Sequence, residues 1–105
     1  SEVAVMNRYR LKLYITGQTP RSRGAIRNLR RLIDDLLSGS CELDIIDVLE
    51  NPQVAEDDKI LATPTLVKEL PLPQRRIIGD LSDKEKVMMG LEITSHDNVG
   101  SGGRP

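Results

Sequence analysis

Apolar residues change their spacing along the first third of the chain. Over residues 9–15 they recur at every second position, which predicts a strand with one face in a core. Over residues 20–37 they recur at intervals of three and four, which predicts an amphipathic helix. Thr19 is suited to cap this helix, Pro20 to open it, and the small residues 38–40 to end it. The apolar stripe of the helix consists of Ile26, Leu29, Leu32, Ile33, Leu36 and Leu37.

A second, well-buried strand is predicted over residues 43–48, where apolar residues predominate. A strand, a helix and a strand within about 40 residues form a βαβ unit, whose strands are parallel with a right-handed crossover. Asn51 is suited to cap a short acidic helix around residues 52–58. A proline interrupts the extended segment 60–67, and a short strand over residues 76–78 ends at a glycine.

The last predicted helix begins at a capping box formed by Ser82 and Glu85, with Asp83 also suited to the positive end of the helix. The resulting order is β-α-β-α-β-β-α, that of a thioredoxin-like domain. Residues 1–8 are then an N-terminal extension, residues 9–94 the domain, and residues 95–105 a disordered Gly/Ser-rich tail.

The local signals disagree between residues 50 and 95. Gly90 lies inside the last predicted helix, at a cost of about 1 kcal/mol relative to alanine. Residues 91–93 are also compatible with an edge strand, and residues 49–66 show no strong periodicity. This half of the chain therefore accommodates more than one arrangement.

Thioredoxin chemistry requires a cysteine after the first strand, where the helix dipole lowers the pKa of the thiol. Residues 16–22 contain none, and the lone Cys41, at the start of the second strand, is interpreted as structural. His96, in the predicted tail, has no companions for a metal site and no nucleophile to activate. Asp57 and Asp58 could touch a cation, but they also fit a solvated helix end. We therefore expect no catalytic, metal or cofactor site, and hence no enzyme.

The composition fits one small domain of 105 residues with a net charge of −1. It contains no apolar run of about 18 residues, so no membrane span is expected. The sequence shows no secretory signal, and a single cysteine fits a reducing compartment, which favours a cytoplasmic location.

Charge is distributed unevenly: residues 8–31 carry eight basic residues and no acid, whereas residues 42–58 carry seven acids and no base. Such segregation favours self-association or a charged partner, although two solvated faces would give the same pattern. The arginines could also neutralise phosphates. Because the net charge is near zero and only two aromatic residues exist, we expect no nucleic-acid partner.

Several spaced blocks of the sequence resemble the KaiB family. These blocks are LENPQVAEDDKILATPTL (residues 49–66), RIIGDLS (residues 76–82), EKV (residues 85–87) and LKLY (residues 11–14), with Gly17, Thr19 and Pro20 between them. The resemblance covers about residues 9–93.

The resemblance implies a regulatory binding protein of the bacterial circadian clock. Such a protein docks on a KaiC-like hexameric ATPase and kinase, sequesters a KaiA-like protein, and favours dephosphorylation of the kinase. The family is metamorphic, so the resemblance also implies a second state, β-α-β-β-α-α-β, in which residues 50–95 are rearranged. It implies self-association as a dimer or tetramer, the tetramer belonging to that second state.

Two sets of residues follow from this resemblance. The partner-binding candidates are Arg23, Arg27, Arg30, Lys59, Lys68, Arg75 and Arg76. The fold-switch candidates are Thr63, Pro64, Pro71, Pro73, Gly90 and Glu92. Gly24, Glu92 and Ser95 depart from the residues usual in the clock members. This leaves open a homologue that acts in stress adaptation through another partner, without a clock role.

Overall fold

The computed structural model describes residues 8–37 and 41–93, and it confirms the predicted order β-α-β-α-β-β-α over this part of the chain. The predicted helix stop at residues 38–40, residues 1–7 of the predicted extension and the predicted tail with His96 lie outside the described residues. The elements are β1 (Tyr9–Ile15), α2 (Pro20–Leu36), β2 (Cys41–Asp47), α3 (Pro52–Asp57), β3 (Thr65–Leu70), β4 (Arg75–Ile78) and α4 (Lys84–Leu91).

The strands form one mixed sheet in the order β2-β1-β3-β4. As predicted for a βαβ unit, β1 and β2 are parallel, whereas β3 pairs antiparallel with both β1 and β4. Leu13 of β1 lies opposite Ile45 of β2 on one side and Leu66 of β3 on the other. The first strand of the sequence is therefore an interior strand of the sheet.

The prediction that β2 is well buried is wrong. None of its residues is fully buried, and Leu43 and Ile45 only pack against the border of the core. The reason is the strand order, which places β2 at an edge with a neighbour on one side only. A run of apolar residues did not distinguish this edge strand from an interior one.

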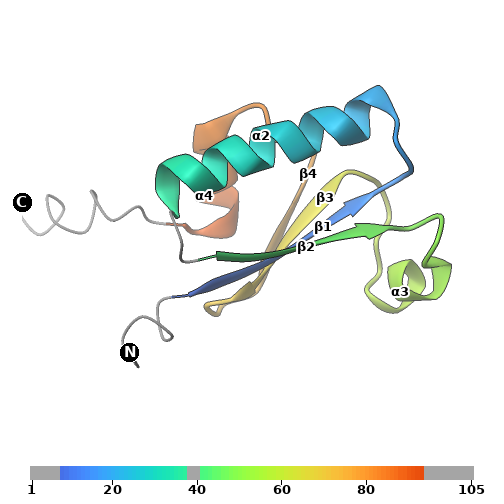
Figure 1. The fold of residues 1–105 in the computed structure, drawn as a ribbon. Helices are drawn as coiled ribbons and strands as arrows, with labels where there is room; N and C mark the ends of the chain where they lie inside the picture. The colour runs from blue at the N-terminus through green and yellow to red at the C-terminus, as the bar shows by residue number, and fades with distance from the viewer. Residues whose placement is uncertain (1–7, 38–40, 94–105) are drawn as a thin grey trace, which may run out of the picture.

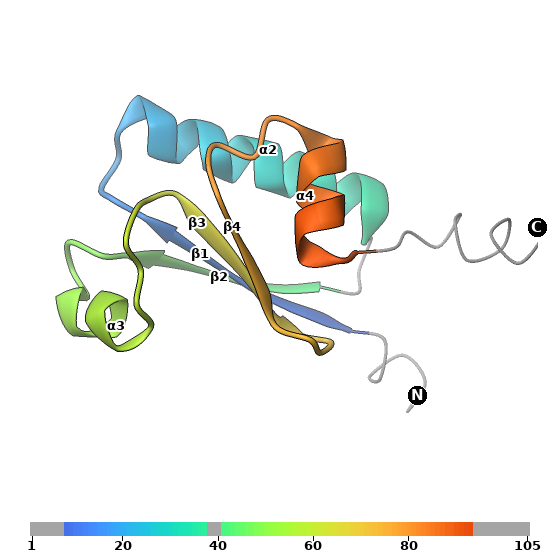
Figure 2. The same ribbon diagram turned by 180° about the vertical axis from the view of Figure 1, so that it is seen from behind.

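Helices α2 and α4 both cover one face of the sheet, whereas α3 lies beside the end of the sheet (Figures 1 and 2). The core lies between these two helices and the sheet, and its apolar side chains come from β1, α2, β3, α4 and the segments next to them. Ala25 extends the predicted apolar stripe toward the start of α2, where the polar residue Ser22 is also buried. The core residues are Leu11, Leu13, Ile15, Ala25, Leu29, Leu32, Leu37, Leu66, Leu81, Val87, Leu91 and Ile93.

Helix α2 begins as its sequence predicts, and α3 does so only in part. Thr19 caps α2 by accepting a hydrogen bond from the backbone N–H of Ser22, with Pro20 in the first turn. Asn51 stands at the cap position of α3 but makes no side-chain capping bond. Its amide Nδ2 instead donates to the carbonyl oxygen of Asp47, 3.1 Å away, which anchors the turn that follows β2.

The predicted capping box at Ser82 and Glu85 is wrong, and the neighbouring aspartate caps α4 instead. The carboxylate of Asp83 accepts a hydrogen bond from the backbone N–H of Lys86 at 3.2 Å. Ser82 belongs to the preceding turn, in which its backbone N–H donates to Asp80 at 3.0 Å. Side chains at adjacent positions with similar capping chemistry cannot be ranked without the backbone path.

Replacing Asp83 by alanine is expected to lower the free energy of unfolding by about 1 kcal/mol, because α4 loses its N-cap. Replacing Ser82 by alanine serves as the matched control and is expected to change it by less than about 0.5 kcal/mol. Urea titration of both variants measures the difference. An equal or larger loss for the Ser82 variant would restore the capping box.

The alternative of an edge strand over residues 91–93 is also wrong in this structure. Helix α4 continues to Leu91, and Glu92 ends it in the left-handed conformation with a φ of 56°. The backbone N–H of Ile93 then donates to the carbonyl oxygen of Met88, and its side chain enters the core. Residues 92 and 93 are thus held against α4 by this hydrogen bond and by the burial of Ile93.

Candidate functional site

Four hydroxyls and several backbone groups meet where β1 ends and α2 begins. The hydroxyl of Ser22 donates to the carbonyl oxygen of Thr16 and accepts from the hydroxyl of Thr19 at 3.0 Å. The hydroxyls of Thr16 and Thr63 share a hydrogen bond, which joins this junction to the loop before β3. Gly17, with a φ of +62°, lies in the turn between β1 and α2, and its backbone N–H donates to the carboxylate of Asp47.

This junction stands where thioredoxin chemistry requires a cysteine, and it holds hydroxyls in place of thiols. A hydroxyl becomes a nucleophile only with a general base beside it. The hydrogen bonds of Thr16, Thr19 and Ser22 in the described chain involve only hydroxyls and backbone groups. The arrangement fixes the start of α2 and supplies no activated nucleophile.

Cys41 lies at the other end of the sheet, opposite Tyr9 at the start of β1. The thiol is half-buried, and burial, followed by the charge of Glu42, raises the pKa of Cys41 to about 11. A thiol with this pKa is protonated at neutral pH, and the thiolate is the reactive form. The structural interpretation of Cys41 therefore agrees with its environment.

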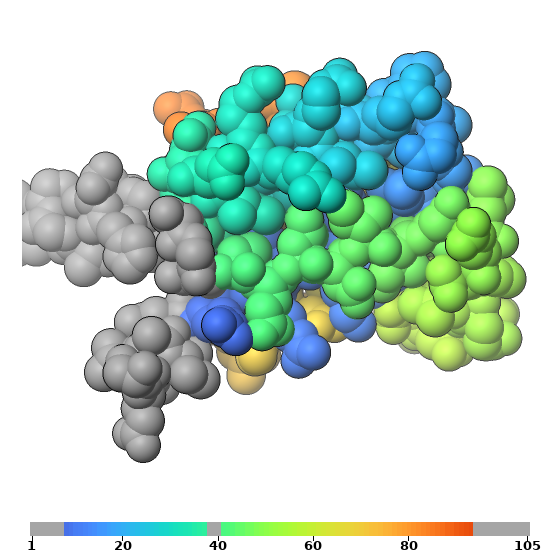
Figure 3. Space-filling model, viewed as in Figure 1, coloured from blue at the N-terminus to red at the C-terminus, as the bar shows by residue number. Residues whose placement is uncertain are grey.

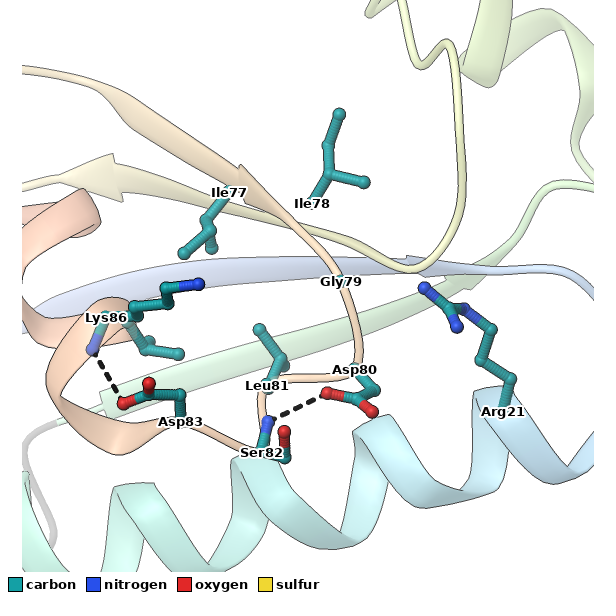
Figure 4. Close-up of a pocket in the computed structure, with 10 residues that line it drawn as sticks. Arg21, Ile77, Ile78, Gly79, Asp80, Leu81, Ser82, Asp83 and Lys86 are labelled. Carbon is teal, nitrogen blue, oxygen red and sulfur yellow. Dashed lines mark hydrogen bonds between the residues drawn. The ribbon is translucent and has the colours of Figure 1, made fainter.

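A hollow of about 240 Å³ opens between the first turn of α2 and the β4–α4 connection (Figure 4). Arg21 and Asp80 line it on one side and Lys86 on the other, with the apolar side chains of Ile77 and Leu81 between them. Hydrogen bonding from the side chain of Ser82, and then from its backbone N–H, lowers the pKa of Asp80, and the positive charge of Arg21 acts in the same direction. The Asp80 carboxylate thus accepts hydrogen bonds within the β4–α4 turn.

The partner-binding candidates of α2 form a stripe on the helix face opposite the core. Arg23, Arg27 and Arg30 are exposed, and Arg31 extends the set by the same spacing. Arg23 donates to the carbonyl oxygen of Gln18 at 2.6 Å, which leaves its charge facing solvent. We call Arg23, Arg27, Arg30 and Arg31 the arginine stripe.

Two further candidates, Lys59 and Arg76, meet on the face of the sheet that α2 and α4 leave open. The guanidinium of Arg76 donates to the carbonyl oxygens of Lys59 and Asp58, both at 3.0 Å. The carboxylate of Asp58 accepts a hydrogen bond from the hydroxyl of Tyr14 in β1. Burial, and then this bond to Asp58, raises the pKa of Tyr14. This cluster holds the end of α3 against β1 and β4.

The remaining two candidates, Lys68 and Arg75, lie opposite each other on β3 and β4. Arg75 is half-exposed and forms an ion pair with Glu92, with 2.9 Å between its Nε and the carboxylate. Lys68, however, is only 1% exposed, on the sheet face covered by the helices. A direct contact with a partner requires an exposed side chain, so Lys68 is not a surface contact in this structure.

Burial lowers the pKa of Lys68, with Arg75 acting in the same direction and Glu92 opposing both. Because the folded chain holds this proton less tightly than the unfolded chain, stability rises with pH between the lowered pKa and 10.5. Replacing Lys68 by methionine is therefore expected to raise the free energy of unfolding at pH 7, by on the order of 1 kcal/mol.

The advantage of the methionine variant is expected to shrink as the pH approaches 10.5. Urea titrations of both proteins from neutral to alkaline pH measure this difference, in which the other titrating groups cancel. A methionine variant that is less stable than the parent at pH 7 would contradict a buried, desolvated amine.

The fold-switch candidates lie at the borders of the elements in the second half. Thr63 bonds to Thr16, and Pro64 is buried directly before β3. Pro71 and Pro73 lie in the β3–β4 turn. At the end of α4, a methyl group added to Gly90 would lie 3.2 Å from Ile77, so any larger residue there presses on β4.

A ladder of alternating charges on the open sheet face was not expected from the sequence. Glu42 pairs with Arg8 at 2.7 Å, and Glu69 pairs with Lys12 at 3.0 Å. Arg10 lies between the two carboxylates, at 3.9 Å from one and 3.8 Å from the other. These pairs satisfy the basic residues of β1, so only the arginines of α2 in the basic segment remain unpaired in the described chain.

Two other kinds of site have no candidate among the described residues. No helix there is long and apolar enough to cross a membrane. Nor does any group of three or more His, Cys, Asp or Glu side chains in that part of the chain converge as metal ligands would.

The sheet order, the two helices on one face and the hydroxyl-lined β1–α2 junction define a thioredoxin-like domain without a dithiol site. Mitochondrial thioredoxin 3 of Saccharomyces cerevisiae matches with a TM-score of 0.66 at 18% identity, over 89% of this chain and 85% of that one. The N-terminal domain of SasA from Synechococcus elongatus matches with a TM-score of 0.67 at 24% identity, over 79% of this chain and 80% of that one. At these identities the likeness concerns the fold.

Sequence comparison identifies the family within this fold class. Residues 12–93 match the model of the KaiB domain. The circadian clock oscillator protein KaiB of Synechococcus elongatus is 59% identical over 85 residues, which cover 81% of this chain and 83% of that protein. The protein of that name from Prochlorococcus marinus strain MIT 9312 is 55% identical over 91 residues, 87% of each chain. The chain belongs to the KaiB family.

Proposed function

We propose that this chain is a regulatory binding protein that docks on a KaiC-like hexameric ATPase and modulates its phosphorylation state. The observation that carries the proposal is the match to the KaiB family over nearly all described residues. The junction of β1 and α2 supports it, because the thioredoxin-like fold is present there without an activated nucleophile. The protein then acts by binding, in the cytoplasm, and a KaiA-like protein is a further partner.

The exposed basic residues are the proposed contacts. The arginine stripe lies on α2, Lys59 and Arg76 on the open face, and Arg75 at the β4 edge of the sheet. Lys68 acts indirectly in this proposal, as the buried neighbour of Arg75 and Glu92. Arginine is well suited to such contacts, because its guanidinium pairs with carboxylates in a fixed geometry.

We further propose that residues 50–95 adopt a second arrangement, in which the protein self-associates as a dimer or tetramer. Three non-glycine residues in this half, Lys59, Leu81 and Glu92, occupy the left-handed region with φ values of 57°, 64° and 56°. Each such residue costs about 1–2 kcal/mol. These costs support a small free-energy gap between two arrangements of the segment that contains Thr63, Pro64, Pro71, Pro73, Gly90 and Glu92.

Native mass spectrometry of the chain with the KaiC-like ATPase of the same organism tests the docking proposal. A complex that accumulates slowly is expected, since the competent state is a minority if the second arrangement predominates. No complex after long incubation would overturn the proposal. Binding that leaves the phosphorylation of the ATPase unchanged would overturn its regulatory part and favour the homologue without a clock role.

A further inference from the structure

Tyr14 is buried on the face of the sheet that α2 and α4 do not cover. Its neighbours in β1, Leu13 and Ile15, belong to the core, so the alternation of the strand directs Tyr14 to the opposite face. Tyr14 is nevertheless only 1% exposed. The end of α3 and Arg76 lie beside it, around a hollow of about 260 Å³. A large side chain is thus enclosed here without being part of the main core.

Helix α3 is held in place mainly at its two ends. It has six residues, none of which is buried, and a helix shorter than about 12 residues is marginal by itself. In Figure 3 it forms the lower right corner of the molecule, with α2 along the upper border. Hydrogen bonds from Asn51 to the carbonyl oxygen of Asp47 hold its start. The position of its other end therefore depends on contacts with the sheet.

Tyr14 and Arg76 hold this end of α3 at the same two residues. The hydroxyl of Tyr14 donates to the carboxylate of Asp58, and Arg76 donates to the carbonyl oxygens of Asp58 and Lys59. A cation at the carbonyl end of a helix is also favourable. Lys59 occupies the left-handed region with a φ of 57°, and its side chain is exposed. The direction in which Lys59 leaves the surface thus depends on one bond from β1 and on two from β4.

We propose that Tyr14 is a positioning residue for docking, which acts through Asp58 on Lys59. The inference rests on the proposed function, in which Lys59 is a contact for the ATPase. Tyr14 is too buried to touch a partner, so its hydroxyl affects binding only through the residues that it holds. A contact residue that is already ordered loses less conformational entropy on binding. Removing this hydroxyl therefore weakens docking without removing any atom of the interface.

Amide hydrogen exchange of the full chain measures the positioning step without the ATPase. The variant Tyr14→Phe keeps the ring and removes only the hydroxyl. The amides of Asp58 and Ile60, which donate to carbonyl oxygens of α3, are expected to exchange roughly tenfold faster than in the parent. The control Tyr9→Phe removes the same atom from the same strand and is expected to leave these two amides unchanged. Unchanged exchange in Tyr14→Phe would overturn the proposal.

Titration of the labelled chain with the ATPase measures the effect on docking. Tyr14→Phe is expected to bind roughly threefold to tenfold more weakly than the parent, and Tyr9→Phe like the parent. Lys59→Gln removes the charge that Tyr14 positions. In that background, adding Tyr14→Phe is expected to cause no further loss, because Tyr14 acts through Lys59. A hydroxyl that only stabilised the fold would weaken binding equally in both backgrounds, and this result would overturn the proposal.

The two measurements separate this inference from the docking proposal. If the parent forms no complex with the ATPase, the docking proposal fails and the role of Tyr14 in docking fails with it. Hydrogen exchange still shows in that case whether Tyr14 holds the end of α3. If the parent binds and Tyr14→Phe binds equally well, the docking proposal stands and the inference about Tyr14 is wrong.

Discussion

Exchanging the charges of Arg75 and Glu92 is expected to lower the affinity for the KaiC-like ATPase by about a hundredfold while the domain stays folded. The variant Arg75→Glu with Glu92→Arg keeps an ion pair between β4 and the end of α4, where the parent pair is 2.9 Å long. The partner then meets a carboxylate in place of a guanidinium, and losing one interfacial charge of this kind costs about 2–5 kcal/mol. Titration of the labelled chain with the ATPase measures the loss.

A matched exchange elsewhere separates docking from folding in this experiment. Arg8 and Glu42 form an ion pair of 2.7 Å at the β2 edge of the sheet, the edge opposite β4, and neither is a proposed contact. The variant Arg8→Glu with Glu42→Arg is expected to bind the ATPase like the parent. If the Arg75 and Glu92 exchange also binds like the parent, Arg75 does not contact the partner.

Replacing Leu13 by alanine is expected to lower the free energy of unfolding by about 2–5 kcal/mol, a large part of the 5–15 kcal/mol typical of a small domain. Leu13 is 0% exposed and has a strand on each side. Its neighbour Ile45 lies on the edge strand and is only half-buried, so Ile45→Ala is expected to cost about 1–2 kcal/mol.

Urea denaturation of the two alanine variants therefore tests the strand order. Equal losses, or a larger loss for Ile45, would place β2 inside the sheet and contradict the order β2-β1-β3-β4. The parent and both variants are compared at one pH, because the pKa of Lys68 makes stability depend on pH.

The element order could be predicted because each element carries its own local signal. The alternation over β1, the apolar stripe of α2 and the polar breaks between them depend only on near neighbours in the sequence. The place of a strand in the sheet depends on partners far away in the chain. Leu43 and Ile45 look like interior residues in the sequence, and only the position of β3 beside β1 shows that they are not.

The candidate site could be predicted as a set of charges, and its geometry could not. Tyr14 and Asp58 are 44 residues apart, and no local pattern pairs them. The burial of Lys68 also could not be predicted from the local pattern. Leu66 is a core residue of the same strand, and the alternation of a strand places Lys68 on the same face as Leu66. That alternation was obscured because Pro64 made the start of the strand uncertain.

The docking of the thioredoxin-like state is tested most directly by amide NMR of the isotope-labelled chain bound to the ATPase domain that receives it. Cross-strand contacts between Lys12 and Val67, and between Val67 and Arg76, belong to the sheet order described above. If the thioredoxin-like state docks, both contacts are expected in the bound chain. A bound chain in which Val67 has lost Lys12 or Arg76 as its neighbour would contradict it.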